Sequence, residues 1–509
     1  MSNKPRAILF PAHDWAVVRA AHFASEMKKR RGLAGIALVH GTKDARCALQ
    51  TKAFDEVVDV VRDFNLAGAD AEASANSRAL ADFERAYGGA SIWQCVVQDA
   101  RRRYKKYSLT RYTPNQILKY LSHAARELEP IFSRWDVIAV VGDLTSPVYR
   151  MVYQMGGTAR PYLVPVTARF FHRFYFDDDM YMGWEECVRA YRRFWREGVP
   201  PEVGAVVDPI VEEIGRANLR PTYFDDALAQ AAKGWFLRRL RPSVWADHAR
   251  DFWFDGIVDG PKNPEGLHWS YWLPPRNIAR RAQYALRRFF YHRHAVKRIP
   301  DGVRYALFLP NSEPEYTLDV QGWPFADQAS LIRVIAQSLP VDMLLLVKDH
   351  PLMVGARPIE FYRRILRLPN VRLISESCLS QELLRASRLV FTITGTIALE
   401  AVCAGIPAIM FGKMFFDQLE GVTVIRDLYE LSGAIDLALT RGATDFGRSA
   451  RAALAAMFTC SYPGRIDSSA LDAAEVSAGN RSALGEALEE ELCRRGTLVQ
   501  PGSQKLEVT

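Results

Sequence analysis

A histidine and a hydroxyl-rich loop stand at the ends of two apolar runs in the second half of the chain. His350 follows one run and is fixed there by a proline, and Thr394-Gly395-Thr396 follows another. A histidine titrates near neutral pH and can donate a hydrogen bond to phosphate, while free N–H groups at a helix N-terminus bind anions. Gly395 permits a tight turn, and Thr396 can cap the next helix. We therefore predict that these four residues bind a phosphate group.

Three charged residues extend this candidate site. Lys348 lies two positions before His350, Glu400 lies one turn into the helix after Thr396, and Lys413 follows the next apolar run. A lone carboxylate in an apolar segment is costly to bury without a partner, so Glu400 is suited to bind ribose hydroxyls beside the phosphate. The alternatives are a packed histidine, an ordinary capped helix and a solvated carboxylate.

The elements that must position these residues alternate regularly. The predicted strands are 305–309, 343–347, 371–374, 389–393 and 408–411, and the predicted helices are 327–338, 359–367, 380–386 and 396–404. Alternating strands and helices with short connections imply a parallel sheet covered by helices. Ligands of such sheets bind beyond the carboxyl ends of the strands, where His350 and Thr394 are expected.

The first part of the chain predicts another α/β unit. Strands are expected at 7–10, 35–39 and 136–141, with a helix at 16–31 that ends at Gly32. We therefore expect an α/β fold of two Rossmann-like domains that face a cleft, with helical insertions. The expected domains are 1–200 as the first Rossmann-like domain, 201–302 as a basic, aromatic and helical connection, 303–440 as the second Rossmann-like domain, and 441–509 as C-terminal helices and a polar tail.

The motifs of the second unit resemble the capsule polysaccharide biosynthesis glycosyltransferases. They are the segments 307–315, Asp327-Gln328, Ser338-Leu339-Pro340, 347–351 and 394–401, all within about residues 303–416, with weaker similarity at Gly142-Asp143 and at 161–176. The resemblance implies a GT-B fold and a CMP-activated sugar donor such as Kdo. Bacterial sialyltransferases have a similar His-Pro motif and a hydroxyl-rich motif on the nucleotide phosphate, with paired serines where this chain has Thr-Gly-Thr.

The leading hypothesis is a glycosyltransferase that moves Kdo or another acidic sugar from a CMP donor to a surface or capsular polysaccharide. Its partners would be the nucleotide-sugar donor and a glycan or glycolipid acceptor, and it would need no cofactor because the nucleotide-sugar is a substrate. The alternatives are a sugar-nucleotide epimerase or a polyol-phosphate transferase of similar two-domain shape. A nucleic-acid-binding protein is a further alternative, but the sequence has no nucleic-acid-binding module signature.

The resemblance implies that the domain 303–440 binds the nucleotide-sugar and that the domain 1–200 binds the acceptor. In a GT-B enzyme, the catalytic base should therefore come from the first domain. Asp143 directly follows the predicted strand 136–141, and His13 follows the strand 7–10. Either group could take the proton from an acceptor hydroxyl. The alternatives are a helix cap for Asp143 and a structural role for His13.

A metal site is not expected. Asp177-Asp178-Asp179 contains a DxD pattern, but three consecutive aspartates more often form a solvated turn. No His/Cys cluster has the spacing of zinc ligands. We therefore expect transfer without a metal ion.

The composition and charge are those of a soluble protein that favours acidic partners. The 509 residues are 49% apolar and 24% charged, and Lys+Arg minus Asp+Glu is 66 − 58 = +8. No run is long enough to span a membrane, the N-terminus lacks a signal-peptide pattern, and the seven cysteines form no CxxC pair. These features predict a cytoplasmic protein.

One segment predicts attachment to the cytoplasmic face of the inner membrane. As a helix, 280–298 places an apolar side opposite a basic one. The apolar side comprises Ala282, Leu286, Phe289, Phe290 and Val296, and the basic side Arg280, Arg287 and Arg298. The alternative is a helix docked on its own domain.

Overall fold

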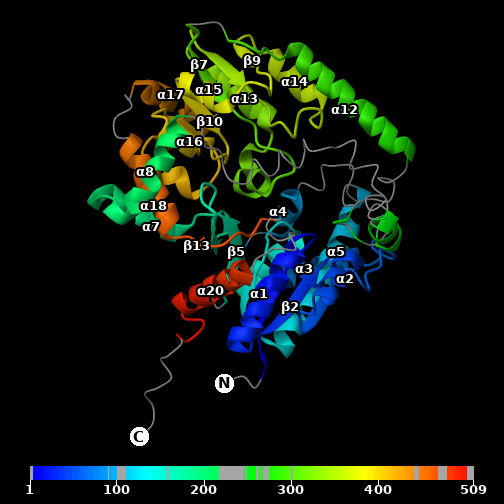
Figure 1. Ribbon diagram of the computed structural model, residues 1–509. Helices are drawn as coiled ribbons and strands as arrows, with labels where there is room; N and C mark the ends of the chain where they lie inside the picture. Colours follow the sequence, from blue (N-terminus) through cyan, green and yellow to red (C-terminus); the bar gives the residue numbers. More distant parts are fainter. Residues whose placement is uncertain are drawn as a thin grey trace. The chain divides into compact units, whose positions relative to one another are not determined.

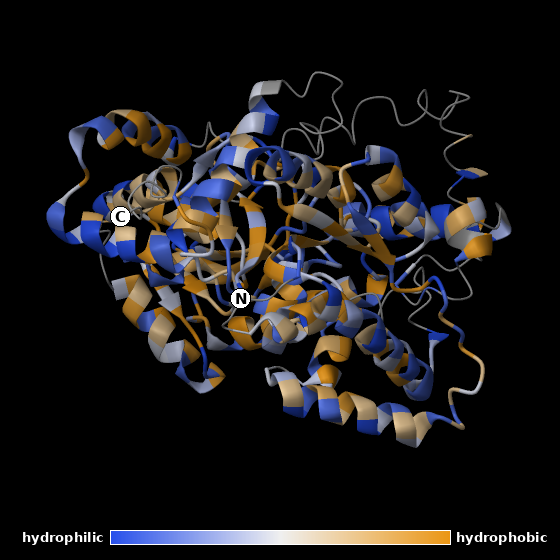
Figure 2. Cartoon of the chain, turned by 90° about the horizontal axis from the view of Figure 1, so that it is seen from below, coloured by the Kyte–Doolittle hydropathy of each residue, from blue (hydrophilic) through white to orange (hydrophobic). Residues whose placement is uncertain are grey.

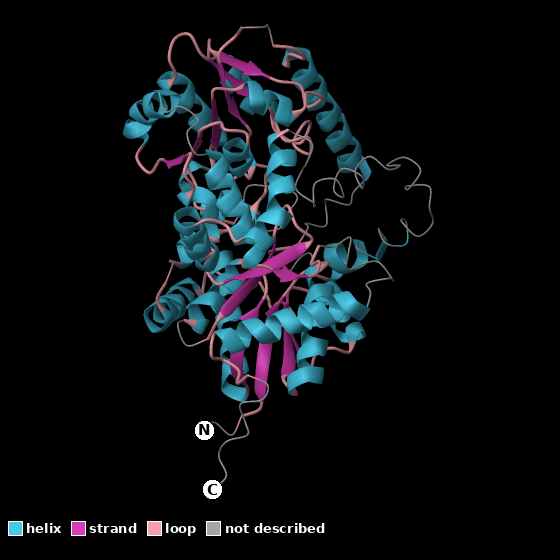
Figure 3. Cartoon of the chain, turned by 60° about the vertical axis from the view of Figure 1, so that its left-hand side comes forward, coloured by secondary structure: helices cyan, strands magenta, loops and turns pink. Residues whose placement is uncertain are grey.

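Two separate sheets organise the chain, each in its own unit. The computed structural model describes residues 4–89, 91–99, 111–157, 160–216, 246, 249–250, 252–259, 263, 265–266, 274–299, 302–440, 446–467 and 478–500. Unit 1 comprises Met1–Asp178, Thr222–Leu273 and Ser461–Thr509, and unit 2 comprises Asp179–Pro221 and Pro274–Cys460. Figure 3 shows the strands of the sheets in magenta, with helices packed alongside.

The sheet of unit 1 has seven strands in the order β13-β6-β5-β4-β1-β2-β3. The strands are β1 (Arg6–Pro11), β2 (Ala34–Val39), β3 (Glu56–Asp59), β4 (Asp136–Val141), β5 (Tyr162–Thr167), β6 (Arg173–Asp177) and β13 (Tyr462–Pro463). Strands β1 to β5 are parallel, whereas β6 pairs antiparallel with β5 and β13 pairs antiparallel with β6. The parallel part has the order 3-2-1-4-5, so its order reverses between β1 and β4.

The helices of unit 1 follow its strands and include one from the end of the chain. They are α1 (Ala16–Arg31), α2 (Thr42–Thr51), α3 (Ala73–Tyr87), α4 (Ile92–Val97), α5 (Pro114–Arg134), α6 (Pro147–Gly156), the π-helical turn η3 (Phe252–Val258) and α20 (Ala478–Arg494). Helix α1 ends at Gly32, whose φ of 64° suits glycine. Helix α20 lies beside α1 (Figure 1) because Arg30 and Arg31 form ion pairs with Glu486 and Glu489.

The sheet of unit 2 has six parallel strands in the order β12-β11-β10-β7-β8-β9. They are β7 (Tyr305–Phe308), β8 (Leu344–Val347), β9 (Val371–Leu373), β10 (Leu389–Thr392), β11 (Ala408–Met410) and β12 (Val422–Val424). Counted from β9 across the sheet to β12, with the strands numbered in chain order, this is the Rossmann order 3-2-1-4-5-6. The switch point therefore lies between β7 and β10. The strands are mostly apolar because helices bury both faces of the sheet. Figure 2 shows orange, the hydrophobic end of its scale, on the strands in the interior of the chain.

The described helices of unit 2 lie before, between and after its strands. They are α7 (Glu185–Glu197), α8 (Pro201–Gly215), α12 (Pro274–His294), η5 (Thr317–Gln321), η6 (Trp323–Phe325), α13 (Gln328–Ser338), α14 (Ile359–Leu366), α15 (Ser380–Ala386), α16 (Ile397–Cys403), η7 (Phe415–Gln418), η8 (Leu428–Glu430), α17 (Leu431–Thr440) and α18 (Phe446–Thr459). The turn η5 is π-helical, whereas η6, η7 and η8 are 3-10 helices.

The predicted α/β class with two Rossmann-like sheets is confirmed. The expected domains are continuous stretches, whereas each unit of the structure combines separate segments of the chain. None of the seven cysteines forms a disulfide. Within the described residues, no helix is long and apolar enough to cross a membrane.

The predicted helix 280–298 is partly wrong at its C-terminal end. Helix α12 stops at His294, and Val296 forms a parallel bridge with Ile374 beyond strand β9. Backbone hydrogen bonds from Val296 to Leu373 and from Ser375 to Val296 hold this extended segment. Val296 and Arg298 therefore do not lie on the helix.

Candidate functional site

The loops after β7, β10 and β11 meet at the switch point of unit 2. The side-chain nitrogen Nδ2 of Asn311 donates to Oγ1 of Thr394 at 2.9 Å, and the backbone N–H of Lys413 donates to the carbonyl of Gln321 at 3.3 Å. A Cβ on Gly412 would lie 2.4 Å from Cγ2 of Thr394, so only glycine permits this approach. The structure thus brings together the Thr394 and Lys413 loops through the loop after β7.

The His350 side chain has a defined neutral tautomer. The backbone N–H of Leu352 donates to Nδ1 of His350 at 3.2 Å, so in the neutral ring the proton sits on Nε2. Burial is the main cause that lowers the pKa of His350, while the charges of Glu315 and Asp349 act in the opposite direction. Above its pKa, His350 therefore presents an Nε2–H donor, as phosphate binding requires.

A buried arginine holds the loop of His350 against the loop after β7. Nε of Arg357 donates to the Asp349 carboxylate at 2.9 Å, its NH1 donates to Glu313 at 2.7 Å, and its NH2 donates to the carbonyl of Asn311 at 2.7 Å. Only 1% of the Arg357 side chain is exposed. The Tyr362 hydroxyl also donates to Asp349. This network fixes Asp349 directly beside His350.

The Thr394-Gly395-Thr396 turn is stabilised by its strand rather than by a cap. The N–H of Gly395 donates to Oγ1 of Thr392 at 3.0 Å, and a Cβ on Gly395 would lie only 2.6 Å from that oxygen. The prediction that Thr396 caps the helix through its side chain is wrong. Thr396 stands at the N-cap of α16, but it has helical backbone angles and makes no side-chain cap hydrogen bond. Its hydroxyl is therefore not committed to the helix.

The three charged residues predicted around this turn have different environments. Lys348 is buried, and its ammonium donates to Oγ of Ser380 at 2.8 Å. Glu400 is buried on α16. Burial of the Cys403 thiol is the main cause that raises its pKa, and the charge of Glu400 raises this pKa further. Lys413 is exposed, with its ammonium 5.2 Å from the centre of the Tyr181 ring. Of the two predicted cations, Lys413 is therefore the exposed one and Lys348 the buried one.

His13 and Asp143 lie at the switch point of unit 1. A Cβ on Gly142 would lie 2.2 Å from the carbonyl oxygen of Pro11, so the ends of β4 and β1 are close together. Oδ1 of Asp143 accepts a hydrogen bond from the buried Arg19 at 2.8 Å. His13 is half-buried, and its ring centre lies 6.1 Å from that of Tyr149.

The alternative role of Asp143 as a helix cap is wrong. The cap of α6 is Ser146, whose hydroxyl accepts from the N–H of Val148. Asp143 instead keeps one carboxylate oxygen on Arg19, and its backbone carbonyl accepts from the Tyr162 hydroxyl.

A buried polar cluster near these residues was not predicted. The Glu265 carboxylate accepts from the Ser146 hydroxyl at 2.8 Å and from the Tyr120 hydroxyl at 3.1 Å. His40 lies between them, with Nδ1 3.1 Å from Tyr120 and Nε2 3.3 Å from Ser146. His40 directly follows β2, so the rule that ligands bind beyond the carboxyl ends of strands could have found it. Nothing in the sequence connects it to Glu265.

The DxD pattern does not form a common site. Asp177 is the last residue of β6 and is buried, Asp178 pairs with Arg495, and Oδ1 of Asp179 accepts from the N–H of Tyr181. Among the described residues, no group of three His, Cys, Asp or Glu side chains is placed to hold a metal ion.

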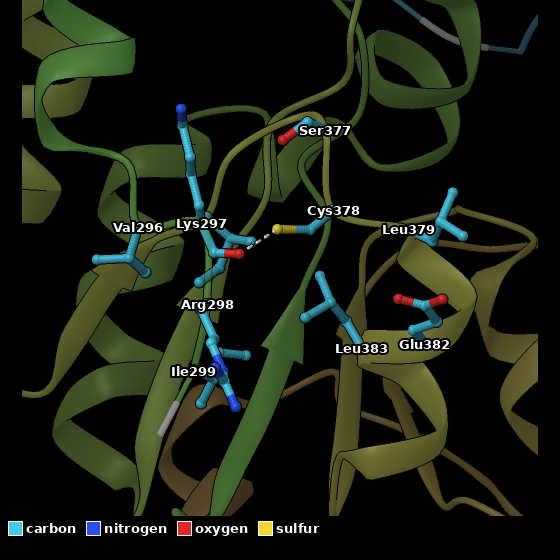
Figure 4. Close-up of a pocket in the computed structure, with 10 residues that line it drawn as sticks. Val296, Lys297, Arg298, Ile299, Ser377, Cys378, Leu379, Glu382 and Leu383 are labelled. Atoms are coloured by element: carbon cyan, nitrogen blue, oxygen red, sulfur yellow. Dashed lines mark hydrogen bonds between the residues drawn. The ribbon is translucent and has the colours of Figure 1, made fainter. Parts of the chain in front are cut away.

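A cavity of about 370 Å³ lies beside the outermost strand β9 (Figure 4). It is lined by Val296, Lys297, Arg298, Ile299, Ile374, Ser377, Cys378, Leu379, Glu382 and Leu383. The Cys378 thiol donates to the carbonyl of Lys297 at 3.3 Å, and burial raises its pKa. Since the switch point lies further inside the sheet, between β7 and β10, this cavity is not the candidate site.

Solved structures with a similar chain path are distant. A KpsC β-Kdo 2,4-transferase from Thermosulfurimonas dismutans matches with 12% identity and a TM-score of 0.34, covering 62% of this chain and 79% of that one. A glycosyltransferase from Rickettsia africae has 11% identity, a TM-score of 0.30 and coverages of 98% and 100%. Anabaena Alr3699/HepE in complex with UDP and glucose has 11% identity, a TM-score of 0.29 and coverages of 96% and 100%. These TM-scores are too low to decide the function.

The sequence comparisons concern mainly unit 2. No curated protein matches the chain. Residues 277–438 match the family described as capsule polysaccharide biosynthesis protein. This segment contains the whole sheet of unit 2 and every residue predicted to bind the donor. Through residues 277–438, about a third of its length, the chain is similar to the capsule polysaccharide biosynthesis protein family.

Proposed function

We propose that the chain is a glycosyltransferase that moves a sugar from a nucleotide donor to a surface or capsular polysaccharide. The observation that carries the proposal is the convergence of three polar loops at the switch point of a six-stranded Rossmann-like sheet. Nucleotides bind at this place in such sheets, and the loops lie within the segment that matches the capsule polysaccharide family.

The proposed roles follow the geometry of the loops. Thr394, Gly395 and Thr396 bind the donor phosphate together with the exposed ammonium of Lys413. The Nε2–H of His350 donates to the leaving phosphate as negative charge develops on it. Lys348 and the buried Glu400 complete the donor site, with Glu400 on the ribose. Catalysis of this kind depends on positioning and on stabilisation of the developing charge.

His13 and Asp143 are the candidates for the base that activates the acceptor. Both lie at the switch point of the unit 1 sheet, where an acceptor sugar would bind by the same rule. Arg19 already holds Oδ1 of Asp143, whereas the described residues form no hydrogen bond with the His13 ring. The His13 imidazole is therefore the group more available to an acceptor hydroxyl.

The donor is proposed to be a CMP-linked acidic sugar that binds without a divalent metal. The nucleoside monophosphate leaving group carries less charge than a diphosphate. Lys413, His350 and the backbone N–H groups of the Thr394 turn can stabilise that charge directly. Because the nucleotide-sugar is itself a substrate, the same arrangement is proposed to need no cofactor.

Thermal unfolding with a panel of nucleotides tests this proposal. CMP, CDP, UDP, GDP and ADP are each added with magnesium and with EDTA. A ligand that binds only the folded state at about 100 times its Kd adds about 2.7 kcal/mol of stability. We expect stabilisation by CMP that survives EDTA and is weaker in Lys413→Ala. Lys297→Ala removes an exposed lysine beside the cavity at β9, so it is the matched control and should bind CMP normally.

Other outcomes separate the parts of the proposal. A preference for UDP or GDP would contradict the CMP donor but keep the site, and dependence on magnesium would contradict metal-free binding. If no nucleotide stabilises the chain, the nucleotide site is wrong. Mass spectrometry of the product distinguishes a new glycosidic bond from an isomerised donor or a phosphodiester, which the epimerase and polyol-phosphate alternatives would give.

Peripheral attachment to the cytoplasmic face of a membrane is proposed for helix α12. Ile278, Leu286 and Phe289 are 68%, 59% and 67% exposed, and they lie on one side of the helix. Near the end of α12, Phe290 packs against the core of unit 2 and Tyr291 is fully buried. The helix is thus docked at its C-terminal end. Its earlier apolar side chains remain exposed, as do Arg276, Arg281 and Arg288, and together they suit an anionic interface. Arg280 and Arg287 of the predicted basic side are half-buried.

Flotation with liposomes tests this attachment. We expect the wild type to float with vesicles that contain phosphatidylglycerol but not with phosphatidylcholine alone, because arginines and apolar side chains act together. The double variant Leu286→Glu, Phe289→Glu should lose flotation. The control variant Val341→Glu, Leu437→Glu makes the same charge change at exposed apolar positions elsewhere in unit 2 and should float normally. Equal flotation of both variants would contradict the proposal.

A further inference from the structure

A buried glutamine at the switch point of unit 2 has no role in the proposed mechanism. Gln321 is the last residue of η5, a π-helical turn that follows β7, and turns of this kind are frequent at functional sites. Only 4% of Gln321 is exposed. Within the described part of the chain, neither Oε1 nor Nε2 of its amide has a hydrogen-bond partner. Burying an amide without a hydrogen-bond partner costs free energy of folding, and a bound ligand that pairs with the amide would offset this cost.

The backbone of Gln321 is fixed against the two loops that are proposed to bind phosphate. Its carbonyl accepts from the N–H of Lys413 at 3.3 Å. The next residue, Gly322, is so close to the β10 loop that a Cβ would lie 2.3 Å from Cγ2 of Ile393. The amide is therefore carried by a rigid segment next to the proposed phosphate site.

The same loop presents a second buried group without a partner. Asn311 uses Nδ2 to donate to Thr394, but its Oδ1 is buried and accepts no hydrogen bond from the described residues. Two amide side chains with unused capacity thus flank the Thr394 turn from the β7 side. Glu400, proposed to bind the ribose, lies on α16 after that turn.

We propose that Gln321 binds hydroxyl groups of the transferred sugar. The inference rests on the proposed glycosyltransferase function, because it places the donor phosphate at the Thr394 and Lys413 loops. A phosphate there carries the nucleoside on one side and the sugar on the other. Gln321 comes from the β7 side of the site, whereas Glu400, assigned to the ribose, comes from α16 after β10. We therefore assign the Gln321 side to the sugar. A primary amide offers a donor and an acceptor side by side, which matches two neighbouring hydroxyls.

This role makes Gln321 a determinant of donor specificity. A site built to hydrogen-bond a substrate hydroxyl rejects an analogue that lacks it, because the buried polar group is then left unpaired. A merely structural glutamine would have its partners within the protein. Gln328, on α13 of the same unit, is such a residue, since its amide bonds to the backbone of Asn311 and to Glu313.

The first measurement is the thermal stability of the unligated chain. Gln321→Met keeps the length of the side chain and removes an unpaired amide, so we expect Tm to rise by about 2–4 °C. Gln328→Met is the matched control, and because it leaves its partners unsatisfied we expect its Tm to fall. A fall in Tm for Gln321→Met would show that the amide has partners in the protein and would overturn the inference.

The second measurement is the affinity for a nucleotide and for its sugar conjugate. Calorimetry uses two pairs, CMP with CMP-Kdo and UDP with UDP-glucose. For the pair that the wild type binds, Gln321→Met should weaken the nucleotide-sugar about 10-fold and change the free nucleotide less than about 2-fold. Equal weakening of both, or of neither, would overturn the sugar assignment while the nucleotide site stands. Failure of the wild type to bind either pair would overturn the proposed function and this inference with it.

Discussion

Replacing His350 with alanine is expected to lower the rate of sugar transfer about 10²–10³-fold while the chain stays folded. The reason is the Nε2–H of His350, which the hydrogen bond from Leu352 to Nδ1 leaves as the donor. That donor is proposed to stabilise charge on the leaving phosphate, which is greatest in the transition state. The loss should therefore appear mainly in kcat rather than in the Kd of the nucleotide.

Single-turnover kinetics together with nucleotide titration measure this effect. His292→Ala removes an exposed histidine from α12 in the same unit, so it serves as the control and should turn over normally. Near-normal turnover in folded His350→Ala would remove this residue from the mechanism. A change confined to nucleotide affinity would assign it to binding alone.

The pH dependence of stability provides an independent readout of His350. Burial lowers its pKa in the folded chain, below the unfolded value of about 6.5. The unfolded chain therefore binds more protons, so the stability contributed by neutral His350 is present above about pH 6.5 and is lost as the pH falls through that value. Denaturant titrations should show the wild type losing its stability advantage over His350→Ala below that pH.

The sequence predicts the strands and their terminal loops because apolar runs, and the glycine, proline and polar residues that end them, are local signals. The expected strands around His350 and Thr394 are confirmed by β8 and β10. The rule that ligands bind at carboxyl strand ends then selects these loops without any knowledge of contacts. The same rule finds His13 and Asp143 at the ends of β1 and β4.

Residues that act through tertiary contacts could not be predicted in this way. Arg357 lies in a segment without a motif, and its three acceptors come from two loops. Gln321 stands out only because the fold buries its amide without a partner. Strand β6 was missed because the aromatic and charged residues after 170 show no clean alternation, although its partner β5 ends close by at Thr167. Its other partner, the short β13, comes from a distant part of the chain. Such features depend on pairing, which local sequence does not encode.

Replacing Arg357 with alanine is expected to destabilise unit 2 by about 3–5 kcal/mol. Its guanidinium is buried and compensates the buried Asp349 and the partly buried Glu313. Without it, a carboxylate remains in the interior next to His350, and the carbonyl of Asn311 loses a donor. Urea denaturation, followed through the fluorescence of unit 2 tryptophans, measures the loss in the free energy of unfolding.

A surface arginine on the same segment is the matched control for Arg357. Arg364 pairs with Asp327, and both side chains are largely exposed, so Arg364→Ala should cost less than about 1 kcal/mol. Adding Asp349→Asn to an Arg357→Met variant should recover part of the loss, because the uncompensated charge is then removed. If Arg357→Ala is no more costly than Arg364→Ala, the network does not hold the two loops together. The position of His350 would then need another explanation, since its neighbour Asp349 is fixed by Arg357 and Tyr362.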